Sequence, residues 1–156
     1  MSKALIVYGS TTGNTEYAAG VIEKTLADGG YQVELMNAAD IDVKDMEGDY
    51  ELVLLGSSTW DDGESAIQED MLPIYENLEE TDIEDKLVAA FGCGDQTYEN
   101  FCAAVDLLTE RAESLGARVL SDGLKIDGDP RNFEDEITEW TEELLDQKES
   151  DPLQTP

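Results

Sequence analysis

The chain has 156 residues, of which 38 are acidic and nine are basic, and it carries a formal net charge of −29. This charge disfavours nucleic acids and anionic membrane surfaces as partners, because both repel an acidic protein. The chain has two cysteines, no Cys-x-x-Cys pair and no histidine, a composition that argues against a disulfide framework and against a zinc or iron–sulfur site.

The length is typical of one domain with a single hydrophobic core, and no change in composition indicates a second. We expect this domain to span residues 1–147 and residues 148–156, "KESDPLQTP", to form a disordered tail. The first apolar run, "ALIVY", is too short for a signal peptide, and no run of eighteen apolar residues occurs. These features predict a soluble, cytoplasmic protein.

Apolar strands alternate with amphipathic helices along the chain. The expected strands cover residues 4–9, 31–37, 50–58, 86–94 and a last strand that begins at 118 and continues through 126. The expected helices cover residues 15–27, 67–77, 100–115 and 132–145, with a weak turn at 41–46.

Strands that are apolar throughout are typical of a parallel sheet covered on both faces, and the alternation predicts a doubly wound α/β fold. Ligands of such sheets bind beyond the carboxyl ends of the strands, where the strand order reverses. Three loops fall at that edge, at residues 10–15, 57–64 and 92–98. We therefore expect them to form the ligand site.

The first loop, "STTGNT", leads directly from a strand into a helix. Free N–H groups and the helix dipole make such a position favourable for an anion, and glycine lets the backbone approach a ligand closely. The hydroxyl groups of the loop add neutral donors, which predicts a site for a phosphate monoester. The alternative is a Thr or Asn helix cap without any ligand.

Three other phosphate-binding folds do not match. A nucleoside-triphosphatase loop needs Gly-Lys-Ser/Thr, but Gly13 is followed by Asn14 and Thr15. A dinucleotide fingerprint needs Gly-x-Gly-x-x-Gly, but the chain reads G-S-T-T-G-N from Gly9. A receiver domain needs acidic residues after the first strand and at the end of the third, where this chain has Gly-Ser pairs.

The second and third loops each place a large aromatic ring among polar residues. Trp60 lies in "SSTWDDGES" and Tyr98 in "GCGDQTYENF". Two rings at the same edge of the sheet suggest a flat ligand between them, with Asp95 at its polar rim, although a single exposed ring often only covers its own core.

The segments "STTGNT", "STW", "GCGDQTY" and "DGLKIDGDP" together resemble flavodoxins, specifically the short-chain type of sulfate-reducing bacteria. The resemblance extends to about Leu145. It implies a flavodoxin-like, doubly wound parallel sheet of five strands in the order 2-1-3-4-5, with helices on both faces.

The resemblance further implies one non-covalently bound FMN and a low-potential one-electron carrier that cycles between semiquinone and hydroquinone and is not an enzyme. Trp60 and Tyr98 would enclose the isoalloxazine ring, and no metal is expected. The expected cofactor-binding residues are Ser10, Thr11, Thr12, Gly13, Asn14, Thr15, Ser58, Thr59, Trp60, Asp61, Asp62, Cys93, Gly94, Asp95, Tyr98 and Cys102.

Two features depart from the usual pattern. Flavodoxins commonly have glycine after this tryptophan, whereas this chain has Asp61, so we expect a less stabilised semiquinone. The acidity is high enough to predict a halophilic surface, a monomer, and redox partners with basic docking surfaces.

The sequence leaves two other functions open. One is a flavodoxin-like, FMN-dependent NAD(P)H quinone or nitro reductase, which would need space above the flavin and a basic group for the second nucleotide. The other is an acidic binding module without redox activity.

Overall fold

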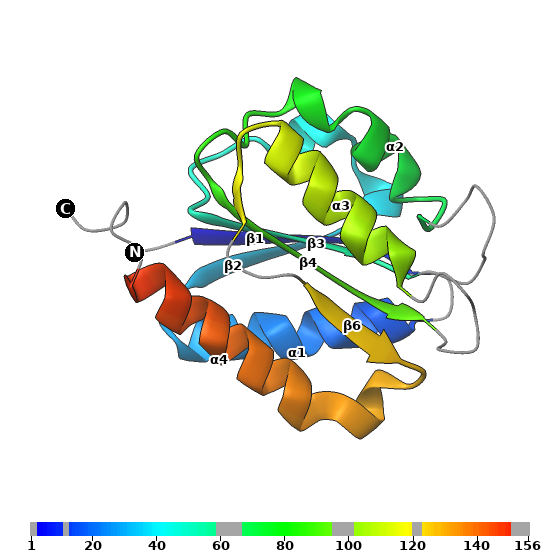
Figure 1. The fold of residues 1–156 in the computed structure, drawn as a ribbon, viewed down its shortest axis with the longest axis vertical. Helices are drawn as coiled ribbons and strands as arrows, with labels where there is room; N and C mark the ends of the chain where they lie inside the picture. The colour runs from blue at the N-terminus through cyan, green and yellow to red at the C-terminus, as the bar shows by residue number, and fades with distance from the viewer. Residues whose placement is uncertain (1–2, 11–12, 59–66, 95–101, 120–122, 151–156) are drawn as a thin grey trace.

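A computed structural model describes residues 3–10, 13–58, 67–94, 102–119 and 123–150, with side chains described up to residue 147. A single twisted sheet forms the centre of the fold (Figure 1). Its strands are β1 (Lys3–Gly9), β2 (Gln32–Asn37), β3 (Leu52–Ser57), β4 (Leu87–Gly94), β5 (Arg118–Val119) and β6 (Leu124–Asp127).

All strand pairs are parallel, in the order β2-β1-β3-β4-β5, and β6 also pairs with β4. The predicted strand order is therefore confirmed. The last strand, predicted as continuous, consists of two pieces that follow the same edge of β4. Gly123, just before β6, has a φ of 103°, and a Cβ there would lie 2.4 Å from Val105.

Helices cover both faces of the sheet (Figure 1). One layer contains α1 (Asn14–Asp28) and α4 (Glu134–Ser150), which follows the short 3₁₀ helix η4 (Pro130–Phe133). The other contains α2 (Leu72–Glu76), α3 (Ala103–Ser114) and the 3₁₀ helices η1 (Ala38–Asp40), η2 (Val43–Met46) and η3 (Leu78–Glu80). The helix expected at 67–77 is thus shorter, and the last helix ends at Ser150 rather than at 145.

The sheet separates two hydrophobic cores because successive side chains of a strand point to opposite faces. Ile6, Leu54 and Phe91 face α1 and α4, whereas Leu5, Leu55 and Val88 face α2 and α3. Every residue of β3 and β4 is buried, which explains their unbroken apolar pattern.

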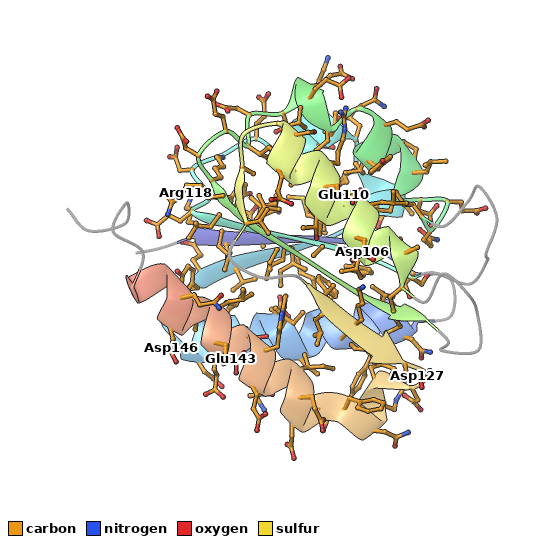
Figure 2. The ribbon with its side chains drawn as sticks, in the orientation of Figure 1. Asp106, Glu110, Arg118, Asp127, Glu143 and Asp146 are labelled. Atoms are coloured by element: carbon orange, nitrogen blue, oxygen red, sulfur yellow. The ribbon has the colours of Figure 1, made fainter. Side chains whose placement is uncertain are left out.

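The acidic residues gather on the outside of both helical layers. Figure 2 labels Asp106 and Glu110 on α3 and Glu143 and Asp146 on α4, and all four are exposed. No helix in the described part of the chain is long and apolar enough to cross a membrane.

Candidate functional site

The loops that follow β1 and β3 begin side by side. The strand register pairs Gly9 at the end of β1 with Ser57 at the end of β3, so Ser10 and Ser58 leave the sheet at the same edge. Gly94 ends β4 and is paired with Asp127 of β6. The predicted meeting of the first and second loops at the carboxyl edge is confirmed for these described residues.

The first loop does not cap helix α1 with a side chain. The N-cap residue is Gly13, in the left-handed conformation with a φ of 90°, and it makes no side-chain cap. Its N–H donates to Ser10 Oγ at 3.0 Å, and the Tyr17 N–H donates to the Gly13 carbonyl at 3.0 Å. The alternative of a Thr or Asn cap is therefore wrong for the described N-cap residue, and the first N–H groups of an α-helix, which have no partner within the helix, face this edge.

Two buried hydroxyl groups at this edge have no hydrogen-bond partner among the residues that the structure describes. Thr15 Oγ1 belongs to the first turn of α1, and Ser58 Oγ follows β3; their residues are 0% and 2% exposed. Burial raises the pKa of the neighbouring Cys93 thiol, and the Thr15 hydroxyl offsets part of that rise, but no hydrogen bond of normal geometry joins the two groups. An unsatisfied buried hydroxyl costs about 1–3 kcal/mol, so both groups fit a site that receives an acceptor such as phosphate.

Ser57 and Gln68 support the end of β3, and the sequence reasoning did not identify either. Ser57 Oγ donates to the Ser58 carbonyl at 3.0 Å and accepts the Gln68 N–H at 2.9 Å. Gln68 Oε1 accepts the N–H groups of Asp70 and Met71 at 2.8 and 3.2 Å. The sequence signal for this support is weak: it is one polar residue, Gln68, directly after the apolar Ile67 in the segment expected to be a helix.

Gly9 has to lack a side chain for this arrangement to form. A Cβ at Gly9 would lie 2.2 Å from Gln68 Oε1 and 2.9 Å from the Met71 Cβ. The buried glutamine therefore packs its side chain directly on the end of β1, and its backbone N–H binds Ser57 at the end of β3.

The two cysteines lie in different cores. Cys93 packs in the core beside α1, and Cys102 packs in the core beside α3, where its thiol donates weakly to the Gly92 and Ile126 carbonyls at 3.7 and 3.8 Å. Burial raises the pKa of each thiol to about 12. Cys93 adjoins Thr15, whereas the thiol of Cys102 faces backbone carbonyl groups. The role of Cys102 in cofactor binding stays a prediction.

Several predicted site residues lie outside the described residues: Thr11, Thr12, Thr59, Trp60, Asp61, Asp62, Asp95 and Tyr98. Of the predicted set, the described residues include Ser10, Gly13, Asn14, Thr15, Ser58, Cys93, Gly94 and Cys102. Within the described ranges, no group of three or more His, Cys, Asp or Glu residues is arranged to hold a metal ion.

The fold and this edge define a class: doubly wound α/β proteins that bind an anionic ligand at the carboxyl ends of their strands. The chain belongs to the flavodoxin family, whose model matches residues 6–140. It is 48% identical over 146 residues to a flavodoxin of Maridesulfovibrio salexigens, an alignment that covers 94% of this chain and 99% of the relative.

Two further comparisons agree. A flavodoxin of Nitratidesulfovibrio vulgaris is 44% identical over 140 residues, which cover 90% of this chain and 95% of the relative. The crystal structure of oxidised Flavodoxin 2 from Bacillus cereus matches with a TM-score of 0.85 and 32% identity, over 94% of this chain and 99% of that one.

Family membership also supplies the general function. Flavodoxins are FMN-based electron carriers that serve partner oxidoreductases, so this chain is an electron carrier and not an enzyme. The alternative of an NAD(P)H-dependent reductase on the same fold is not favoured.

Proposed function

We propose that the first turn of α1 and the end of β3 form a neutral cradle for the phosphate of FMN. Thr15 and Ser58 contribute their buried hydroxyl groups, and Asn14 contributes its N–H group at the positive end of the α1 dipole. The observation that carries this proposal is the pair of buried hydroxyl groups that have no partner within the described ranges.

The outer residues of the cradle follow from the resemblance. Ser10, Thr11, Thr12 and Gly13 complete the phosphate loop, and Thr59 extends the site toward the ribityl chain. The rings of Trp60 and Tyr98 enclose the flavin, backbone at Asp61, Asp62, Cys93, Gly94 and Asp95 meets its polar edge, and Cys102 belongs to the same site.

The bound flavin supplies one-electron chemistry, and the chain sets how strongly it reduces. The loop "STTGNT" contains no base, so the phosphate charge is not neutralised by a side chain of this segment. At an effective dielectric constant of about 20, a unit charge about 8 Å away raises the energy of an added electron by about 2 kcal/mol. Together with a net charge of −29, this favours a low reduction potential.

The cradle is tested by removing its hydroxyl groups without changing side-chain shape. In Thr15→Val and Ser58→Ala, we expect the affinity for FMN to fall about tenfold, because each variant loses one hydrogen bond to an anion. We expect the flavin-free protein to be as stable as the parent or more stable, because an unsatisfied hydroxyl is removed.

Thr141→Val is a matched control in α4. Its hydroxyl is fully buried but donates to the Ile137 carbonyl at 2.9 Å, far along the chain from the cradle. This variant should lose stability and keep its affinity for FMN. Equal FMN affinities in the parent, Thr15→Val and Ser58→Ala would contradict the assignment of the cradle.

The protein acts as a cytoplasmic monomer that docks on basic surfaces of its redox partners, and its acidic surface is adapted to high salt. The support is the excess of 38 acidic over nine basic residues. Self-repulsion at this charge is screened by salt, so the free energy of unfolding should rise between low and molar salt. A constant stability across this range would contradict adaptation to salt.

Docking is tested by the rate of electron transfer to a basic partner protein. A rate that does not fall as the salt concentration rises would contradict docking on a basic surface.

A further inference from the structure

We propose that Arg131, Tyr17 and Glu134 form a latch that positions the first turn of α1 for phosphate, so that Arg131 is a positioning residue for FMN. The inference rests on the proposed phosphate cradle. Figure 1 shows the parts it joins at one end of the molecule: the start of α1, the tip of β6 and the start of α4.

The contacts of the latch connect α1 to the beginning of α4. The Tyr17 hydroxyl donates to Glu134 Oε1, and the Arg131 guanidinium carbon lies 4.7 Å from the centre of the Tyr17 ring. Glu134 is the first residue of α4, and Arg131 belongs to η4. The two residues therefore hold the ring by its edge and by its face at once.

The turn that carries Arg131 is itself fixed to the sheet. Asp129 Oδ1 accepts the Arg131 N–H at 2.9 Å and the Arg131 Nη1 at 3.2 Å, and these bonds lower the pKa of Asp129. The Gly128 N–H donates to the Gly94 carbonyl at 2.8 Å. The latch therefore extends from the end of β4 through residues 128–134 to the first turn of α1.

Tyr17 and the cradle share one helical turn. The Tyr17 N–H donates to the Gly13 carbonyl at 3.0 Å, and this bond fixes the position of Tyr17 relative to the start of α1. Thr15 lies between these two residues. Hydrogen bonds to an anion weaken steeply when the donor moves from its best distance or direction. A shift of the Tyr17 ring would consequently misplace the Thr15 hydroxyl and the free N–H groups.

The latch acts by position and not by attracting phosphate. Arg131 contributes one positive charge, whereas its partner Asp129 and the Glu134 carboxylate bound by Tyr17 contribute two negative charges, so the group is net negative. The side chains of Arg131 and Asp129 are also 58% and 49% exposed, and solvent screens their charges. A contribution of Arg131 to phosphate binding must therefore come mainly from geometry.

The experiment compares FMN with riboflavin, which lacks the phosphate, by titrating the full-length, flavin-free chain and following fluorescence. In Arg131→Gln, we expect the affinity for FMN to fall about threefold to tenfold and the affinity for riboflavin to remain that of the parent. Tyr17→Phe, which keeps the ring, should give a smaller change of the same kind. The unchanged riboflavin affinity shows that each variant is folded.

Arg131→Lys separates position from charge. Lysine keeps the positive charge but loses the planar, forked guanidinium, so we expect it to resemble Arg131→Gln. Arg111→Gln is the matched control: Arg111 pairs with Glu79 in the opposite helical layer, and its loss should change neither affinity.

Three results would overturn the inference: equal losses for FMN and riboflavin, no loss for either flavin, or an Arg131→Lys variant that binds FMN as the parent does. A different result would contradict the proposed phosphate cradle itself: the parent protein binding FMN no more tightly than riboflavin.

Discussion

The two helical layers are attached to the sheet in different ways. The layer of α1 and α4 consists of helices of 15 and 17 residues that pack on each other and are joined by the Tyr17–Glu134 bond. The opposite layer contains α2, only five residues long, and is tied to β3 by the buried polar contacts of Ser57 and Gln68.

This difference shows how one site is supported from two sides. Thr15 is placed by a long helix through apolar packing, whereas Ser58 is placed by a strand end that a short polar network holds. Long helices gain stability from an extended apolar face, but a helix of five residues has little such face and needs specific hydrogen bonds.

The largest effect that tests this comparison is the loss of a core side chain from each layer. Phe91→Ala removes a fully buried ring beneath α1 and α4 and should lower the free energy of unfolding by about 3–5 kcal/mol. Leu108→Ala in α3 should cost about 2–4 kcal/mol. Chemical denaturation measures both, and a larger loss for Leu108→Ala than for Phe91→Ala would contradict this order.

A smaller effect is expected where the β3 and β4 ends approach each other. A Cβ at Gly92 would lie 2.0 Å from the Ser57 carbonyl oxygen, and backbone cannot move aside as a flexible side chain can. Gly92→Ala should therefore lower the free energy of unfolding by about 2–3 kcal/mol.

Gly20→Ala in α1 is the control for Gly92→Ala. No heavy atom lies within 4 Å of a Cβ at Gly20, and this residue is in the middle of a helix. It should raise the free energy of unfolding by about 0.5–1 kcal/mol. Destabilisation by both substitutions would contradict the close approach as the cause at Gly92.

The charge on the outer face of α4 gives a salt-dependent effect. Glu139 is exposed and has acidic neighbours three and four residues away on both sides: Asp135, Glu136, Glu142 and Glu143. Glu139→Lys changes four repulsive pairs into attractive ones and should stabilise the protein by about 1 kcal/mol at low salt. In molar salt, the gain should largely vanish.

Glu110→Lys provides the comparison in the other layer. Glu110 has acidic neighbours at Asp106 and Glu113, and Asp106 already pairs with Lys125 at 3.0 Å. The stabilisation at low salt should be smaller than for Glu139→Lys. Equal gains in both variants would show that repulsion is not concentrated on α4.

A last effect is expected only at alkaline pH, and it involves one tyrosine in each layer. Tyr8 donates to Glu16 at 2.8 Å and Tyr50 donates to Glu34, and burial followed by these contacts raises the pKa of each phenol to about 12. Because the folded pKa lies above the unfolded value of 10, the neutral form stabilises the fold fully below pH 10. This contribution is lost as the pH rises from about 10 to 12.

Phenolate absorbance and denaturation at several pH values measure this loss, and Tyr8→Phe and Tyr50→Phe should each reduce its slope. The buried thiols of Cys93 and Cys102, whose pKa values are also raised to about 12, add a loss that begins near pH 9. Thiolate absorbance separates their contribution. A phenol that titrates near pH 10 in the folded protein would contradict the burial of that tyrosine.

The sequence by itself determined the two covered faces and the edge that carries the site, and the strand order followed from the resemblance to flavodoxins. The continuous apolar runs of β3 and β4 could only be buried on both faces, and the polar loop from Ser10 to Thr15 followed a strand and began a helix. These features depend on local pattern and on the motif "STTGNT", which a single sequence contains in full.

Tertiary structure alone decided how the site is supported. Tyr17 and Glu134 are 117 residues apart, and Ser57 and Gln68 meet only because β3 and the approach to α2 converge. The same holds for Thr15 and Ser58, whose lack of a partner among the described residues depends on what surrounds them in space. Hydrophobic periodicity specifies which side of an element is buried, but contacts between distant polar groups are set by the packing of several elements at once.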